Sequence, residues 1–409
     1  MTSLAMAAGF HALPLPIIQL SLSAVLKCGQ SFRWSAYPLN LPAGDASSPT
    51  HEYRFCLRDR VVCLRQTATH ILYRTVLPDP QPGADQQELL EAETLLWLKD
   101  YFQLNVDLAL LYGEWGSRDK VFLGIQDRFS GIRMLRQDPW ENLISFICSS
   151  NNNISRITKM VQSLSKEYSP PLLSLPVPDG SGVEETYHPF PPPSALAHPD
   201  VSARLRSLGF GYRADFIHRT AKMLVDTHGD SMHSRESSEP SERWLMTLRH
   251  MSTEDARAEL LKFVGVGRKV ADCVLLMSLD KTDVVPVDTH VHQIAIKYYG
   301  MKGSTKGKTN MTPKLYDELC TKFVKVWGDY AGWAHSVLFT SDLKSFASHG
   351  LPQTMSTPPA SPVKNRKKRS REMTDLASTN LLSTSSSSES ATATGFACSP
   401  NLAKRVKKR

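Results

Sequence analysis

The sequence lacks the segments that place a protein in or across a membrane. No apolar run reaches the roughly 18 residues that a membrane-spanning helix needs, and no Lys or Arg precedes Lys27. A secretory signal has a basic start and a mitochondrial presequence contains arginines, so the sequence favours neither. We therefore expect a protein without a membrane partner.

Cysteines are few and unsuitably spaced for a disulfide or metal framework. The seven cysteines lie at positions 28, 56, 63, 148, 273, 320 and 398, and no two of them have the CxxC spacing. An odd number of scattered cysteines in a long chain is typical of reduced thiols in an intracellular protein. The same spacing argues against a structural zinc or an iron–sulfur cluster.

Net charge is almost absent from most of the chain. The formal net charge is +8, but residues 356–409 alone contain 11 Lys and Arg against 3 Asp and Glu, so the remainder is balanced. The basic clusters at 364–371 and 404–409 are typical of nuclear import signals, although a cationic tail that holds DNA without regard to sequence is an alternative. We expect a nuclear protein that import receptors recognise through this tail.

The hydrophobic pattern changes from a two-residue period to a helical period. Residues 53–76 alternate and are rich in β-branched and aromatic side chains, which predicts two or three antiparallel strands of a sheet that begins near residues 32–34. From Gln87 onward the period is helical. The sequence predicts an α+β protein: an N-terminal antiparallel sheet domain (1–105) packed on an all-helical domain (106–349), then a disordered basic tail (350–409).

Helix start signals support this division at Asp138-Pro139, at Thr312-Pro313 and at Ser252 with Asp255. The Pro-rich residues 170–199 and the Ser-rich residues 228–242 interrupt the pattern, and we expect mobile loops there. After the helix that starts near Gln87, further helices are expected over residues 140–149, 155–168, 202–208, 214–226, 254–263, 269–279, 290–299, 314–326 and 330–342.

Two of these helices are joined by a short glycine turn, Val264-Gly265-Val266-Gly267. The glycines permit a tight turn and let its backbone amides approach an outside group closely. Amides beside a helix N-terminus suit a phosphate, so this helix–hairpin–helix would hold a DNA backbone without reading bases. The alternative is an ordinary glycine turn, since the pattern alone is weak.

The residues after the turn suggest chemistry. Lys269 lies in the first turn of the second helix, where the helix end and Arg268 both disfavour a charged amine, as a nucleophile requires. Asp288 follows the extended segment 284–287. It would be structural as a helix N-cap, or catalytic as a carboxylate facing a sugar that gains oxocarbenium character; one residue can do both.

Six blocks of sequence, together with these residues, resemble the helix–hairpin–helix Gly/Pro-Asp superfamily of DNA glycosylases, and closely the eukaryotic 8-oxoguanine DNA glycosylase/AP lyase family. The resemblance extends over about residues 20–343 and implies damaged double-stranded DNA as the partner and no required cofactor. We expect a monomer and no metal, although a cation held by the hairpin carbonyls is an alternative. The blocks are GQSFRW (29–34), FICSSNNNISRI (146–157), LGFGYRA (208–214), VGVGRKVADC (264–273), VPVDTHV (285–291) and YAGWAHSVLF (330–339).

The family's catalytic and base-binding roles fall on matching residues. The resemblance makes Lys269 the nucleophile and Schiff-base amine, and Asp288 the catalytic carboxylate. Gly29 would offer its carbonyl to the ring N–H that oxidised guanine has and guanine lacks. Cys273 and Phe339 would sandwich the flipped base, and Cys273 lies four residues after Lys269, on the same helix face.

Other implied contacts are with the DNA around the lesion. Asn151, Arg156 and Arg213 would fill the vacated space and bind the orphaned cytosine, Tyr212 would wedge the base stack, and His290 would touch a phosphate. The alternatives are purely structural: the asparagine run could cap the C-terminus of a helix, and the arginines could be solvated residues on helix surfaces.

Two positions depart from the family pattern. His335 stands where the family usually has Gln, and Phe263-Val264 stands where it usually has Leu-Pro, which changes only the stiffness of the turn. His335 lies four residues before Phe339 and would line the same pocket. Protonation removes the acceptor of an imidazole, and its unperturbed pKa is about 6.5, so we expect acidification to weaken base reading through His335.

The sequence thus predicts a bifunctional DNA glycosylase/AP lyase that extrudes 8-oxoguanine opposite cytosine, displaces it with Lys269 and nicks the strand by β-elimination. A relative acting on alkylated or pyrimidine lesions is one alternative, disfavoured by Gly29 and residues 151–153. A non-catalytic DNA-binding module is another, disfavoured by the presence of both Lys269 and Asp288.

Overall fold

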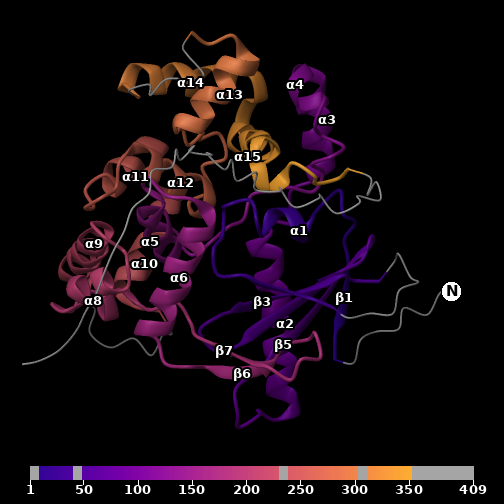
Figure 1. Cartoon of the computed structure of the whole chain (residues 1–409), viewed down its shortest axis with the longest axis vertical. Coiled ribbons are helices and arrows are strands. Elements are labelled where there is room, and N and C mark those ends of the chain that lie inside the picture. The colour runs from indigo at the N-terminus through magenta and orange to yellow at the C-terminus, as the bar shows by residue number, and fades with distance from the viewer. Residues whose placement is uncertain (1–8, 40–47, 230–237, 303–310, 352–409) are drawn as a thin grey trace, which may run out of the picture. The chain divides into compact units, whose positions relative to one another are not determined.

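The N-terminal sheet is wider than the alternating stretch alone indicates (Figure 1). We analysed a computed structural model that describes residues 9–39, 48–229, 238–302 and 311–351. All five strands are antiparallel to their neighbours, in the order β1-β5-β4-β3-β2. The predicted strands within residues 53–76 are confirmed. The strands are β1 (His11–Pro14), β2 (Ser35–Pro38), β3 (His51–Cys56), β4 (Val61–Gln66) and β5 (His70–Val76).

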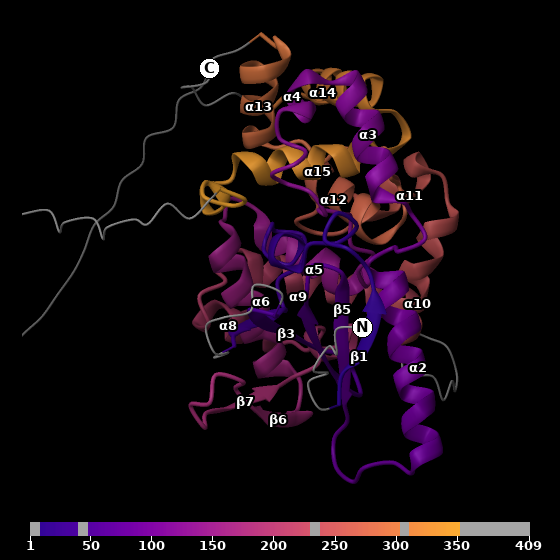
Figure 2. The ribbon, with the colours of Figure 1, turned by 90° about the vertical axis from the view of Figure 1, so that its right-hand side faces the viewer.

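Both faces of this sheet are covered. Helix α2 (Ala84–Tyr101) lies along the sheet (Figure 2), and its Leu98 and Tyr101 belong to one apolar cluster with Val62 of β4. On the other face of the sheet, Val61 and Cys63 of β4 pack in a second apolar cluster with Tyr187. Strand β4 is therefore buried on both sides, so the alternation expected over residues 53–76 does not hold for its first four residues, which are all buried.

Tyr187 belongs to a hairpin that the sequence did not predict. Strands β6 (Leu173–Pro176) and β7 (Glu184–Tyr187) pair antiparallel, within the segment expected to be a mobile loop. That expectation is wrong for these residues, because the hairpin is stabilised by the sheet face that it covers. The predicted Ser-rich loop, residues 228–242, is too long. Helix α9 continues to His228, and α10 begins at Pro240 with a capping box between Glu239 and Glu242. Residues 230–237 lie outside the described part.

The predicted helices lie close to the observed ones, but five further helices were not predicted, namely α1, α3, α4, α7 and α10. The three predicted start signals are confirmed, because Asp138, Ser252 and Thr312 each accept a backbone N–H bond at the start of a helix. The helices are α1 (Leu22–Val25), α3 (Leu108–Arg118), α4 (Lys120–Leu123), α5 (Pro139–Ser149), α6 (Ile154–Tyr168), α7 (Pro193–Leu196), α8 (Val201–Ser207), α9 (Arg213–His228), α10 (Pro240–Thr247), α11 (Thr253–Leu260), α12 (Arg268–Ser278), α13 (Thr289–Tyr299), α14 (Pro313–Trp327) and α15 (Ala331–Asp342).

The expected α+β class is confirmed, and two of its helices position the candidate site. Residues 139–148 of α5 and 270–278 of α12 are buried throughout. Burial of both helices in one core fixes the end of α5 against the start of α12, where Lys269 lies. In the described part of the chain, no helix is both long and apolar enough to span a bilayer, and six cysteines are free thiols. The predicted tail lies outside the described residues from 352 onward.

One close approach in this core gives a stability prediction. A Cβ added at Gly332 of α15 would lie 2.3 Å from the Val284 carbonyl oxygen and 2.9 Å from that of Thr282. Backbone cannot yield as a side chain can, so Gly332→Ala should lower the free energy of unfolding by about 1–3 kcal/mol or more. Gly113→Ala, in α3 with nothing within 4 Å, should instead raise it by about 1 kcal/mol. Urea unfolding tests both; equal midpoints would contradict the prediction.

Candidate active site

Lys269 lies at the start of α12, as expected, and reaches the end of α5. Its Nζ lies 3.3 Å from the Ser149 hydroxyl and 4.8 Å from the centre of the Phe146 ring. The neighbouring Arg268 points its guanidinium to Asp317 of α14, at 2.6 Å. The cationic neighbour that the sequence placed beside Lys269 is therefore paired with a carboxylate.

Asp288 is the N-cap of α13, as expected. Its Oδ1 accepts from the backbone N–H groups of His290 and Val291, both at 2.9 Å. Both capping bonds use one carboxylate oxygen, so Oδ2 takes no part in the cap. The structural and the catalytic interpretation of Asp288 are consequently compatible within one side chain.

The structure brings the predicted catalytic and base-binding residues to one cavity of about 70 Å³. They come from α12, α15, the start of α13 and the loop after α1. Burial raises the pKa of the Cys273 thiol to about 11, which keeps it neutral. The cavity is lined by Cys28, Gly29, Gln30, Phe146, Lys269, Cys273, Leu276, Met277, Pro286, Asp288, His335, Ser336 and Phe339.

His335 lines this cavity, but its expected titration near neutral pH is wrong. The side chain is only 6% exposed, and its Nε2 has no hydrogen-bond partner among the described residues. Burial lowers the pKa of His335 to about 4. A desolvated imidazole is costly to protonate, so His335 stays neutral where a solvated histidine would already be charged.

This lowered pKa gives a pH prediction. Between pH 6.5 and 4 the unfolded chain binds a proton at His335 that the folded chain does not, so its contribution to stability is present above pH 6.5 and is lost toward pH 4. The loss is on the order of 3 kcal/mol. In urea unfolding, the free energy of unfolding should fall more over this pH range for wild type than for His335→Gln. The acid limbs of their activity should coincide above about pH 5; a divergence near pH 6.5 would contradict the burial argument.

The glycine hairpin adjoins this cavity. Gly265 has φ +81°, and Phe216 of α9 packs so closely that a Cβ there would lie 2.4 Å from its ring. Thr220 of α9 also donates to the Val264 carbonyl at 2.9 Å. A second, open cavity of about 710 Å³ runs past Gly265 and Gly267 to Lys269, Asp288 and Asn151. The hairpin amides and the reactive residues therefore share one recess.

Of the three asparagines at 151–153, two have structural roles and one faces the recess. The Asn152 side chain donates to the last turn of α5 at Cys148, and Asn153 caps α6. Asn151, exposed and with φ +47°, is left facing the recess.

The other predicted DNA-binding residues lie around this turn or beside Phe339. Tyr212, 49% exposed, donates to the Ser150 carbonyl. The buried Arg213 donates to the carbonyls of residues 150 and 151, and Arg156 donates to that of Gly209. His290 packs edge-on against Phe339, 5.1 Å between ring centres, beside Asp342, and lines neither cavity.

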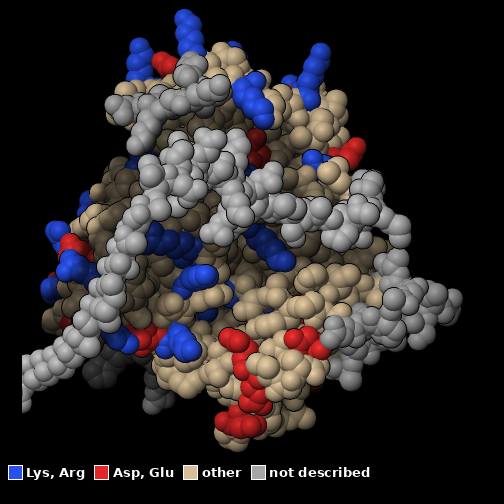
Figure 3. Space-filling model, in the orientation of Figure 1, with Lys and Arg blue, Asp and Glu red and all other residues tan. Residues whose placement is uncertain are grey.

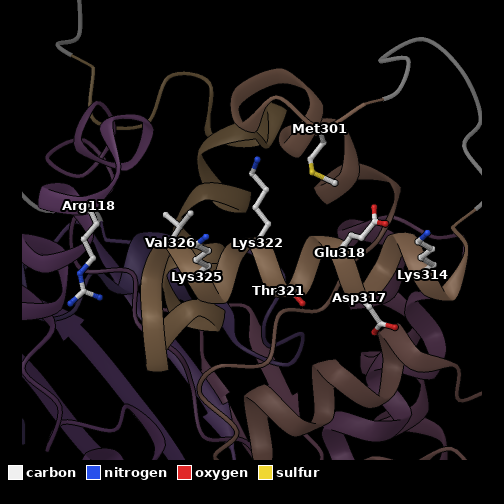
Figure 4. Close-up of a pocket in the computed structure, with 9 residues that line it drawn as sticks. All are labelled: Arg118, Met301, Lys314, Asp317, Glu318, Thr321, Lys322, Lys325 and Val326. Carbon is white, nitrogen blue, oxygen red and sulfur yellow. The ribbon is translucent and has the colours of Figure 1, made fainter.

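Basic side chains gather near the candidate site, although the chain outside the tail is balanced in charge. Figure 3 shows several Lys and Arg side chains in the recessed middle of the face that carries α5, α6 and α12. A separate cavity of about 1190 Å³ lies along α14 (Figure 4). It contains none of the predicted site residues and has both basic and acidic side chains, so we assign it no role in the site.

Sequence reasoning missed Phe146 and Ser149, which contact Lys269, and Tyr316, which lines the open recess with Lys269 and Asp288. Phe146 and Ser149 lie inside the matched block 146–157 and share a helix face, which is the only available signal. Their approach to Lys269 depends on the packing of α5 on α12.

The chain is similar to known DNA repair proteins over most of its described length. Residues 12–143 match the family model for the N-terminal domain of 8-oxoguanine DNA glycosylase, and residues 144–318 match that for HhH-GPD superfamily base excision DNA repair proteins. The N-glycosylase/DNA lyase of Saccharomyces cerevisiae is 35% identical over 346 residues, 80% of this chain and 84% of that protein. The N-glycosylase/DNA lyase OGG1 of Arabidopsis thaliana is 34% identical, over 83% and 81%.

A solved structure of the Clostridium acetobutylicum 8-oxoguanine glycosylase/lyase has a TM-score of 0.60 and 25% identity, covering 82% of this chain and 95% of that one. The family models together span most of the described residues, and both curated relatives are similar over most of their length. The chain belongs to the 8-oxoguanine DNA glycosylase family of HhH-GPD base excision repair proteins and is a DNA glycosylase with DNA lyase activity.

Proposed function

We propose that this enzyme removes 8-oxoguanine from duplex DNA where the lesion faces cytosine, through Lys269. The observation that carries the proposal is the shared cavity: Lys269, Asp288 and the predicted base-binding residues line the same small space. Extruding a base costs a few kcal/mol of unstacking, and contacts in such a cavity offset that cost.

The proposed reaction has two steps. Lys269 Nζ attacks C1′ of the sugar, and the C1′–N9 bond breaks with its electron pair leaving on the base, which takes up a proton. Asp288 Oδ2, free of the capping bonds, stabilises the positive charge that develops on the sugar. Ring opening gives an imine at C1′; loss of a C2′ proton then breaks the C3′–O bond and nicks the strand.

Recognition of the oxidised base would use one backbone and three side-chain groups. The Gly29 carbonyl would accept from the N7–H of 8-oxoguanine, whereas guanine would leave that acceptor bare. The neutral thiol of Cys273 and the ring of Phe339 would enclose the base. His335, neutral and with an unpartnered Nε2, would supply one hydrogen bond to its edge.

Reading of the opposite cytosine is assigned to Asn151, Arg156 and Arg213, with Tyr212 as the wedge. The Arg213 Nε has no partner among the described residues, but Arg213 is only 3% exposed, so its side chain would have to turn outward to reach the cytosine. The Clostridium acetobutylicum relative is recorded with duplex DNA that has cytosine opposite 8-oxoguanine, which supports the same pairing here.

The test is borohydride trapping on duplexes that differ in one base. Rapid trapping with 8-oxoguanine opposite cytosine, and slower trapping opposite adenine, are expected. Preferred trapping with an alkylated purine or an oxidised pyrimidine would support the relative with another substrate. Binding without any trapping would support the non-catalytic module.

We further propose that the basic tail directs the protein to the nucleus; those residues lie outside the described part. Deletion after Gly350 should leave base removal on a short duplex largely unchanged, because the matched blocks precede it. The same deletion should reduce nuclear accumulation and flatten the salt dependence of binding to undamaged DNA. Unchanged localisation together with an unchanged salt slope would contradict both roles.

A further inference from the structure

We propose that Tyr316 is a positioning residue, which holds Asp288 in register with Lys269 by bridging the segment before α13 to helix α12. The inference rests on the proposed roles of Lys269 and Asp288. Tyr316 itself comes from a third element, α14. It lies outside the six short sequence blocks quoted above, although it is within the residues that match the HhH-GPD family model.

The Tyr316 hydroxyl makes two hydrogen bonds. It accepts from the backbone N–H of Val287 at 3.0 Å and donates to Asp272 Oδ2 at 2.6 Å. Val287 is the residue before Asp288, and Asp272 lies one helical turn after Lys269 on α12. One oxygen atom therefore links the backbone of one reacting residue to the helix of the other.

The Asp272 carboxylate, which binds this hydroxyl, is itself buried and has a second hydrogen-bond partner. The carboxylate is 1% exposed and also accepts from Arg257 Nε at 2.7 Å. Two buried acceptor oxygens thus take one bond each from α11 and α14, so Asp272 joins these helices at the base of the hairpin. A fully partnered buried carboxylate fixes the geometry around it.

The ring of Tyr316 is fixed as well. The Arg268 guanidinium lies 4.3 Å from its centre and 2.6 Å from an oxygen of Asp317. In Figure 4, Asp317 points to the opposite side of α14 from Lys322. Because Arg268 directly precedes Lys269, this contact ties α14 to the first turn of α12.

Loss of the Tyr316 hydroxyl should affect the placement of Asp288, and so the reaction rate, more than the stability of the fold. Without the hydroxyl, the Val287 amide has no acceptor in a place where its residue is 2% exposed, and the segment before Asp288 can shift to find one. A misplacement of about 1 Å between reacting groups can cost about a hundredfold in rate. DNA affinity comes from other groups, so it should not change.

The experiment compares Tyr316→Phe with a matched control, Tyr112→Phe. Tyr112 is equally buried, and its hydroxyl also accepts from a backbone amide, that of Ile132, and donates to an oxygen, the Phe129 carbonyl. Single-turnover base release at saturating enzyme, affinity for the lesion duplex and the melting temperature are measured for wild type, both variants and Lys269→Gln.

We expect Tyr316→Phe to slow base release about ten- to a hundredfold with unchanged affinity, and Tyr112→Phe to lose similar stability without slowing. Equal rates for the two Tyr variants would overturn the inference. If Lys269→Gln still released base and was still trapped, the proposed function would fail instead, whatever Tyr316→Phe did.

If Tyr316→Phe does not fold, a second variant, at Asp272, tests the same bridge. Asp272→Ala removes both acceptor oxygens, so the Tyr316 hydroxyl loses its partner on α12 and base release should slow to a similar extent. Where both variants fold, the double variant should be no slower than the slower single variant, since both break one bridge. Additive slowing, or a wild-type rate for Asp272→Ala, would overturn the inference.

Discussion

Lys269→Gln is expected to abolish covalent trapping by borohydride while binding of the lesion duplex survives. Glutamine has no nucleophilic amine, and loss of a covalent nucleophile costs on the order of a thousandfold or more in rate. Its side chain still fits beside Ser149 and Phe146, and the hairpin amides of residues 264–267 that would hold phosphate are untouched. Trapping and a binding titration on the same duplex measure both effects.

The matched control is Lys262→Gln, which removes the same charge from the same hairpin. Lys262 is 63% exposed and pairs with Glu259, so its loss should leave trapping at the wild-type rate. A covalent adduct of Lys269→Gln at wild-type yield would mean that another amine does the chemistry.

Asp288→Asn is expected to slow base release about a hundred- to a thousandfold without loss of affinity or stability. An asparagine oxygen can accept the two N–H bonds that Oδ1 accepts now, so the cap of α13 is kept. The negative charge is lost, and with it the stabilisation of the sugar cation. Single-turnover rates and urea unfolding separate the two roles.

Asp107→Asn is the matched control, because Asp107 caps α3 through the same two amide positions, at 3.1 and 3.4 Å. It should leave the rate unchanged. Asp288→Ala should lose the rate and also about 1 kcal/mol of stability with the cap. If Asp288→Asn destabilised as much as Asp288→Ala, capping would be the main role of this residue.

The helices, and the positions of Lys269 and Asp288, could be predicted from the sequence because the signals for them are local. A helix start depends on a few neighbouring residues, as at Asp138-Pro139, and an amphipathic period depends on one face along one segment. Lys269 and Asp288 could be placed at two helix starts for the same reason, and the matched blocks supplied their roles.

The hairpin β6–β7 was missed because its stability is not local. Its four-residue strands contain Pro176 and three glutamate or threonine positions, and they are held by the sheet face that Tyr187 covers. A short two-stranded hairpin is at best marginally stable alone, so no local signal for it was strong.

The sequence alone determined the α+β class, the helix–hairpin–helix and the residues with reactive groups, since each follows from composition, period or spacing within one segment. Only the tertiary structure decided that Gly29, Cys273, His335 and Phe339 meet Lys269 and Asp288 in one cavity. It also decided that His335 is neutral, because desolvation depends on what packs around a side chain and not on its neighbours in the chain. The bridge through Tyr316 has the same origin: a hydrogen bond between residues far apart in sequence exists only once their helices have packed.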